Sequence, residues 1–115
     1  MPTATFKSFE VVVVPFPFTD SAATKRRPAL VLSTQEFNDR AAHLVLAMIT
    51  SHENRGWPLD TEIHDGRAAG LSHASVVRMK LFTLDERFVL RRAGALAAAD
   101  RAAVQRALGR LLATG

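Results

Sequence analysis

Short apolar runs, separated by prolines, glycines and other turn residues, occupy most of this chain, and their spacing is the strongest constraint on its fold. The runs are rich in Val, Leu and Ile, and short continuous runs of such residues are typical of buried strands. We expect strands at residues 9–14, 29–33, 43–50, 59–63, 74–81 and 87–90, with a turn or helical piece at 35–38. Many short strands at close spacing predict a small β-barrel.

The hydrophobic period changes near the C-terminus. Apolar residues there recur at helical spacing, as Leu96, Ala99, Ala103, Val104, Ala107, Leu108, Leu111 and Leu112. This spacing predicts one amphipathic helix, although no Ser, Thr, Asn or Asp cap stands near Ala97, where the helix would begin. The expected fold class is therefore mainly β with α, a small barrel carrying a C-terminal amphipathic helix.

A chain of 115 residues provides enough core for one domain. Residues 1–8 are polar and unpatterned, so we expect a loose N-terminal segment followed by a single domain at 9–115. The apolar residues 11–14 are followed at once by Pro15 and Pro17, which argues against a signal peptide or a membrane span. The absence of cysteine excludes disulfides, thiolate zinc sites and cysteine nucleophiles. These features predict a cytoplasmic protein with no membrane partner.

The net charge of +4 and the isoelectric point near 10.7 fit an anionic partner, such as nucleic acid or an acidic protein. An arginine- and alanine-rich composition is also what a GC-rich coding sequence gives, so charge alone does not identify the partner. The sequence contains no glycine-rich phosphate loop, no closely spaced histidine pair and no Gly-x-Ser-x-Gly elbow. Nucleotide hydrolysis, simple metal catalysis and hydrolase chemistry therefore lack a motif.

Polar residues gather where the predicted strands begin or end. Arg27 and Pro28 open the second strand, Thr50 and Ser51 close the third with His52 beyond them, and residues 70–75 lead into another. If these ends converge, a cation, hydroxyls and imidazoles share one pocket. RNA supplies its own nucleophile in the 2′-hydroxyl, so cleavage needs only a base, an acid and a cation for the developing charge, with no metal. The same residues are equally compatible with ordinary structural roles at strand ends.

Five segments together resemble the MazF/PemK toxins of bacterial type II toxin–antitoxin systems. They are Glu-Val-Val-Val-Val-Pro-Phe-Pro-Phe-Thr-Asp at 10–20, Lys-Arg-Arg-Pro-Ala-Leu-Val-Leu-Ser at 25–33, Ala-Met-Ile-Thr-Ser at 47–51, Gly-Leu at 70–71 and Gly-Ala-Leu at 94–96. The resemblance extends from about Phe9 to Leu112. It implies an SH3-like barrel, a homodimer and a cognate antitoxin partner. It also implies cleavage of single-stranded RNA at selected sequences, without cofactor or metal, leaving a cyclic phosphate.

The resemblance places the family's arginine before proline on Arg27 and its strand-end threonine on Thr50. We assign Arg27 to phosphate binding and transition-state charge, because a guanidinium that stays protonated is a poor base. Thr50 would hold the phosphate or the attacking hydroxyl. Some relatives carry a carboxylate where this chain has Ala22, and others carry Arg and Asp where it has His73 and Ser75.

These departures make His73 our candidate general base, because imidazole can exchange protons near neutral pH. His52 is the second candidate and Asp20 a distant third. The predicted catalytic set is Arg27, Thr50 and His73. The predicted substrate-binding set is Asp20, Lys25, Arg26, Ser51, His52, Ser75 and Arg78.

Base selection is expected to depend on the loops at 19–26 and 51–58, where Trp57 either stacks a base or packs, with packing favoured. Two other functions fit the same fold. One is a family member that binds RNA without cutting it, suggested by the missing carboxylates. The other is a non-enzymatic toxin like CcdB, which binds a topoisomerase. That toxin uses a C-terminal Trp-Gly-Ile ending, whereas this chain ends in Ala-Thr-Gly.

Overall fold

Six strands, two α-helices and two short 3-10 helices make up the part of the chain that the computed structural model describes, residues 5–15 and 25–113. Their order is β1 (Glu10–Pro15), β2 (Arg26–Val31), α1 (Gln35–Ala41), β3 (His43–Ser51), η1 (His52–Asn54), β4 (Thr61–Ile63), β5 (Ser75–Asp85), η2 (Glu86–Phe88), β6 (Arg91–Ala95) and α2 (Ala98–Leu111). Elements η1 and η2 are the 3-10 helices.

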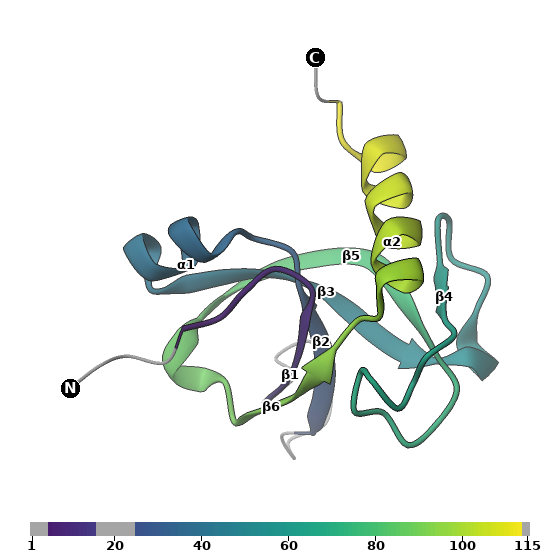
Figure 1. The fold of residues 1–115 in the computed structure, drawn as a ribbon, viewed down its shortest axis with the longest axis horizontal. Helices are drawn as coiled ribbons and strands as arrows, with labels where there is room; N and C mark the ends of the chain where they lie inside the picture. The colour runs from purple at the N-terminus through teal and green to yellow at the C-terminus, as the bar shows by residue number, and fades with distance from the viewer. Residues whose placement is uncertain (1–4, 16–24, 114–115) are drawn as a thin grey trace.

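The strands form one antiparallel sheet in the order β4-β5-β3-β2-β1-β6. The sheet curls into a half-barrel, and α2 stands beside β4 (Figure 1). The register shifts between Val11 and Val12 in β1 and between Ala47 and Met48 in β3, and such irregularities bend strands. The mainly β fold with a C-terminal helix, expected from the spacing of the apolar runs, is confirmed.

Both faces of the central strands are covered, which explains why their sequences lack a polar face. Neighbouring residues of a strand point to opposite sides of the sheet. One buried cluster lies under α2 and includes Val11, Leu30, Ala47, Ile49, Val77, Val104 and Ala107. The other lies on the opposite face and includes Phe6, Val12, Val14, Ala29, Val31, Leu44, Leu46 and Phe82. The continuous apolarity of β1 and β3 therefore reflects burial on both sides.

The last strands differ from the expectation. Residues 86–88 form η2 instead of a strand, because the side chain of Asp85 accepts the backbone N–H of Arg87 at 3.0 Å and caps a helical turn. Strand β5 runs without interruption from Ser75 to Asp85, and the final strand is β6. Strand β6 contains Gly94 and no β-branched residue, so its conformation comes from pairing with β1 and not from its own preference.

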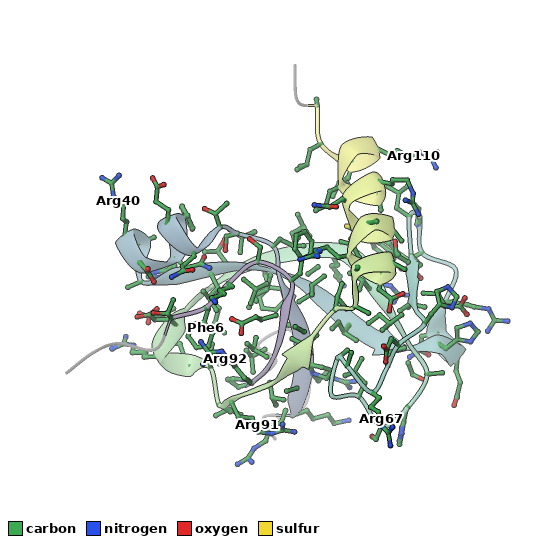
Figure 2. All side chains as sticks on the ribbon, in the orientation of Figure 1. Phe6, Arg40, Arg67, Arg91, Arg92 and Arg110 are labelled. Atoms are coloured by element: carbon green, nitrogen blue, oxygen red, sulfur yellow. The ribbon has the colours of Figure 1, made fainter. Side chains whose placement is uncertain are left out.

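The described part of the N-terminal segment, residues 5–8, is anchored and not loose as expected. Phe6 is 5% exposed, and its backbone carbonyl accepts a hydrogen bond from Asn38 Nδ2 at 2.9 Å. The guanidinium of Arg92 lies 4.5 Å from the centre of the Phe6 ring, and Figure 2 shows the two side chains together. Asn38 and Arg92 lie far from Phe6 in the sequence, so the composition of residues 1–8 could not predict these contacts.

Helix α2 begins at Ala98 and has no side-chain cap at Ala97, as the sequence predicts. Asp100, in the first turn, ties the helix to the turn that follows β4. It is 2% exposed, and its carboxylate accepts the backbone N–H groups of His64 at 3.0 Å and Asp65 at 2.9 Å. A carboxylate is also favourable near a helix N-terminus. Among the helices that the structure describes, none is long and apolar enough to cross a membrane.

Candidate functional site

The sheet register brings the polar strand ends together. Ala29 of β2 is paired with Met48 of β3, and continuing that register by two residues sets Arg27 opposite Thr50. Residues opposite each other in a sheet share a face, so Arg27 and Thr50 share one face, on the side away from α2. On the other side of β3, Ser51 is paired with Ser75 of β5. Three consecutive strands of the sheet therefore contribute to one edge.

A pocket of about 190 Å³ opens at this edge. It is lined by the polar residues Arg27, Thr50, Ser51, Ser72, His73 and Ser75, with Pro28, Ile49 and Leu71 as its apolar wall. Among the residues that the structure describes, no Asp or Glu belongs to this lining. Each water occupies about 30 Å³ in the liquid, so the pocket has room for an anion the size of phosphate. The predicted catalytic residues Arg27, Thr50 and His73 all line it.

Thr50 is held in a defined orientation. It is 6% exposed, and its Oγ1 accepts a hydrogen bond from Asn54 Nδ2 at 3.1 Å. A hydroxyl has one donor and two acceptor positions, so this contact leaves the Thr50 proton available to a ligand. Ser51 is arranged in the same way, because its Oγ accepts the backbone N–H of Glu53 at 3.4 Å and caps η1.

Arg27 is half-buried on β2, and the following Pro28 fixes the backbone at the pocket wall. Within the described residues, no carboxylate lies within ion-pairing distance of its guanidinium. An arginine at a pocket edge with no carboxylate partner among the described residues is suited to an oxyanion, which it can bind through two parallel hydrogen bonds.

His73 lies on the exposed loop before β5 and lines both this pocket and a neighbouring one of about 290 Å³. The loop is held by Ser75, whose hydroxyl donates to the His73 carbonyl at 2.8 Å. Ser75 was predicted to bind substrate. Its hydroxyl holds the His73 backbone, and Ser75 also lines the pocket, where its oxygen can accept a hydrogen bond from a ligand.

Two other predicted residues, His52 and Arg78, do not line the pocket. The Nε2 of His52 lies 2.6 Å from Glu62 Oε1, and its Nδ1 lies 3.3 Å from a guanidinium nitrogen of Arg55. Arg78 pairs with Asp60 at 3.1 Å and donates to the Asn54 carbonyl at 2.6 Å. Both side chains brace the segment 52–62, so His73 is the histidine that the fold brings to the pocket.

A second pocket of about 400 Å³ extends the first and shares Pro28, Leu71 and Ser72 with it. Its cations are Arg26, which was predicted, and Arg91, which was not. Figure 2 shows Arg91 projecting at the lower edge of the molecule, on the same edge as Arg67. Sequence reasoning missed Arg91 because β6 itself had been misplaced. Lys25 is exposed and lies directly before β2, and Asp20 lies outside the described residues, as does Ala22.

Close backbone contacts hold the loop that carries Leu71, Ser72 and His73. Gly70 has φ of +73°, and a Cβ there would lie 2.0 Å from the Ala93 carbonyl oxygen. A Cβ at Gly94 would lie 2.3 Å from the Ala68 oxygen. The loop therefore rests directly on β6, and only glycine permits this approach.

No group of three or more His, Asp or Glu side chains is arranged to hold a metal ion in residues 5–15 and 25–113. The pocket instead combines a cation, hydroxyl donors and an imidazole. It can bind a phosphate group and exchange a proton beside it.

A family model described as PemK-like, MazF-like toxin of type II toxin-antitoxin system matches residues 7–112. The chain is similar to MazF from Deinococcus radiodurans in its crystal form I, with 25% identity, a TM-score of 0.75 and coverage of 97% of this chain and 100% of that one. No curated protein matches the sequence.

Two solved complexes are also similar. A MazE-MazF structure (form III) from Deinococcus radiodurans has 26% identity and a TM-score of 0.77, covering 97% of this chain and 100% of that one. A mycobacterial endoribonuclease in complex with its cognate antitoxin shares the fold, with 17% identity, a TM-score of 0.75 and 98% of both chains covered.

Proposed function

Because the chain belongs to the PemK-like, MazF-like toxins of type II toxin–antitoxin systems, we propose that it is an endoribonuclease that cleaves single-stranded RNA. The observation that carries this proposal is the pocket that Arg27, Thr50 and His73 line together. It offers what cleavage by the RNA's own 2′-hydroxyl requires, namely a cation, an oriented hydroxyl and a proton acceptor.

In the proposed reaction the 2′-hydroxyl oxygen attacks the adjacent phosphorus. The new P–O2′ bond forms as the P–O5′ bond breaks, which gives a 2′,3′-cyclic phosphate and a 5′-hydroxyl. His73 takes the proton of the 2′-hydroxyl, and the leaving O5′ takes up a proton. Arg27 binds the non-bridging oxygens, where negative charge increases in the transition state, and Thr50 donates its hydroxyl to the same phosphate. RNA and water supply all the reacting atoms.

The cations of the adjoining pocket support the proposal that the ligand is an extended RNA strand. Arg26 and Arg91 line the adjoining pocket, and within residues 5–15 and 25–113 neither lining contains a carboxylate. Cations along a groove attract the phosphate backbone of nucleic acid and make its binding sensitive to salt. Arg26 and Arg91 would therefore hold phosphates that flank the one at Arg27.

We also propose that a cognate antitoxin inhibits the protein, that it acts as a homodimer, and that it works in the cytoplasm, where messenger RNA is found. The similarity to a mycobacterial endoribonuclease solved with its cognate antitoxin supports the first of these. The net charge of +4 would favour an acidic antitoxin segment over the groove.

The test is cleavage of a long RNA of mixed sequence in EDTA, with the ends of the products mapped. We expect discrete cuts that leave cyclic phosphates. Arg27→Ala should slow them about 100- to 1,000-fold, the typical effect of removing one transition-state charge stabiliser. Arg40→Ala is the matched control, because Arg40 is exposed on α1, well away from the pocket (Figure 2). Intact RNA from about pH 5 to 9 would refute catalysis, and salt-sensitive binding without cleavage would instead identify a binding-only protein.

A further inference from the structure

The segment between η1 and β4 presents the single tryptophan of the chain to solvent. Packing was the favoured expectation for Trp57, but its side chain is 44% exposed and belongs to neither buried cluster. A large aromatic side chain left open to water beside a basic site is a candidate binding surface.

Two cations of β5 fix the indole. The guanidinium carbon of Arg78 lies 5.5 Å from the ring centroid, and the ammonium nitrogen of Lys80 lies 5.6 Å from it. Residues two apart on a strand project from the same face, so both cations approach the ring from β5. Each contact is within the range of a cation–π interaction. The indole therefore lies against the sheet in a defined orientation, with positive charge next to it.

The backbone under the indole is also held. Asp60 Oδ2 accepts the N–H groups of Gly56 at 3.1 Å and Trp57 at 3.0 Å, and the Asp60 N–H donates to the Trp57 carbonyl at 3.0 Å. The same carboxylate pairs with Arg78. Because one buried carboxylate ties the turn to the sheet, the ring needs little further ordering when a ligand arrives, and this favours binding.

A short series of hydrogen bonds connects Trp57 and Arg78 to the pocket. Arg78 donates to the carbonyl of Asn54, and the side chain of Asn54 donates to Thr50. Thr50 is paired with Val76 in the sheet, and Arg78 is two residues farther along the same face of β5, a rise of about 7 Å. The indole is therefore connected, through Arg78 and Asn54, to a residue that lines the pocket.

We propose that Trp57, with Lys80 beside it, is a stacking subsite for a base of single-stranded RNA next to the phosphate held at Arg27 and Thr50. The inference rests on the proposed function and adds a recognition element to the same site. Bases of single-stranded nucleic acid stack on aromatic side chains near cations, and they do so with little dependence on sequence because every base has a flat π-face. Lys80 is exposed and can contact the adjoining phosphate.

The experiment uses the fact that Trp57 is the only tryptophan, so its emission reports on this subsite alone. A 2′-O-methyl oligoribonucleotide, which lacks the attacking hydroxyl, is titrated into the wild-type protein. We expect saturable quenching of the emission. An oligomer of the same length that is abasic at its central positions should bind through its phosphates with much weaker quenching.

Variants extend the test, with affinity measured by the anisotropy of a labelled oligomer. Trp57→Ala should weaken binding about 5- to 150-fold, and Trp57→Phe should recover most of the loss because it keeps an aromatic face. Phe37→Ala is the matched control, because Phe37 is 45% exposed and lies on α1, at the other end of the molecule from β4 (Figure 1). Its affinity should equal that of wild type.

The outcomes separate this inference from the proposed function. If the wild type cleaves RNA while its emission is unchanged by bound oligomer and Trp57→Ala binds normally, the stacking subsite is wrong and the nuclease stands. If emission and affinity respond as expected but RNA is never cut, the subsite stands and the nuclease is wrong. A Trp57 that responds only to a protein partner would also overturn the subsite.

Discussion

Asn54 donates its side-chain amide to the hydroxyl oxygen of Thr50 at 3.1 Å, across the turn that follows β3. The contact uses an acceptor position of Thr50 and leaves its proton for a ligand. Asn54 is itself placed by η1 and by the hydrogen bond from Arg78 to its carbonyl. It acts on the pocket through Thr50 and is therefore a positioning residue.

This relationship predicts losses of different size from two small substitutions at Asn54. Asn54→Ala removes one hydrogen bond and should lower kcat about 5-fold with little change in KM, because a net hydrogen bond contributes about 1 kcal/mol. Asn54→Asp should lower kcat further, because its carboxylate would accept the Thr50 proton and place negative charge near the phosphate. Steady-state cleavage of a defined oligonucleotide measures both, and an Asp variant as active as wild type would exclude this role.

His73 and His52 should differ sharply in their effect on cleavage. His73→Gln should lower kcat about 100- to 10,000-fold, the usual range for loss of a general base. His52→Gln is the matched control, because His52 contacts Glu62 and does not line the pocket. Single-turnover cleavage rates distinguish the two. Equal losses in both variants, or a larger loss at His52, would reassign the base.

Gly70 should be far less tolerant of a methyl group than Gly109. Gly70→Ala should lower the free energy of unfolding by at least about 2 kcal/mol, because alanine is strained at positive φ and its Cβ would meet the Ala93 carbonyl. Gly109 lies in α2 with no atom within 4 Å of an added Cβ, so Gly109→Ala should stabilise by about 1 kcal/mol. Chemical denaturation measures both variants, and similar values for the two would contradict the close contact of the loop with β6.

Asp100 should contribute more to stability than an exposed carboxylate. Asp100→Ala leaves the N–H groups of His64 and Asp65 without their acceptor and should lower the free energy of unfolding by about 3 kcal/mol. Asp39→Ala, at an exposed position on α1, should change it by less than about 0.5 kcal/mol. Thermal and denaturant melts provide the values. If Asp100→Ala left the free energy of unfolding unchanged, water would replace the carboxylate as hydrogen-bond acceptor without loss of stability.

Much of the fold follows from local pattern. Strands β1 and β3 and helix α2 were predictable because an uninterrupted apolar run indicates a strand buried on both faces and helical spacing indicates a helix buried on one face. Strand β6 was not, because Arg-Arg-Ala-Gly-Ala has no strand preference of its own and is extended only through its pairing with β1. Phe6 was missed for a similar reason, since its partners Asn38 and Arg92 are distant in sequence.

The sequence by itself determined the mainly β class, the C-terminal helix and the placement of Arg27 and Thr50 at strand ends, because these depend on neighbouring residues. Only the tertiary structure decided which polar groups share a pocket. It brought His73 to Arg27, turned His52 and Arg78 toward Glu62 and Asp60, and placed Asn54 on Thr50. The pairing register between strands and the contacts across loops determine which polar groups meet. The order of neighbouring residues specifies neither of them.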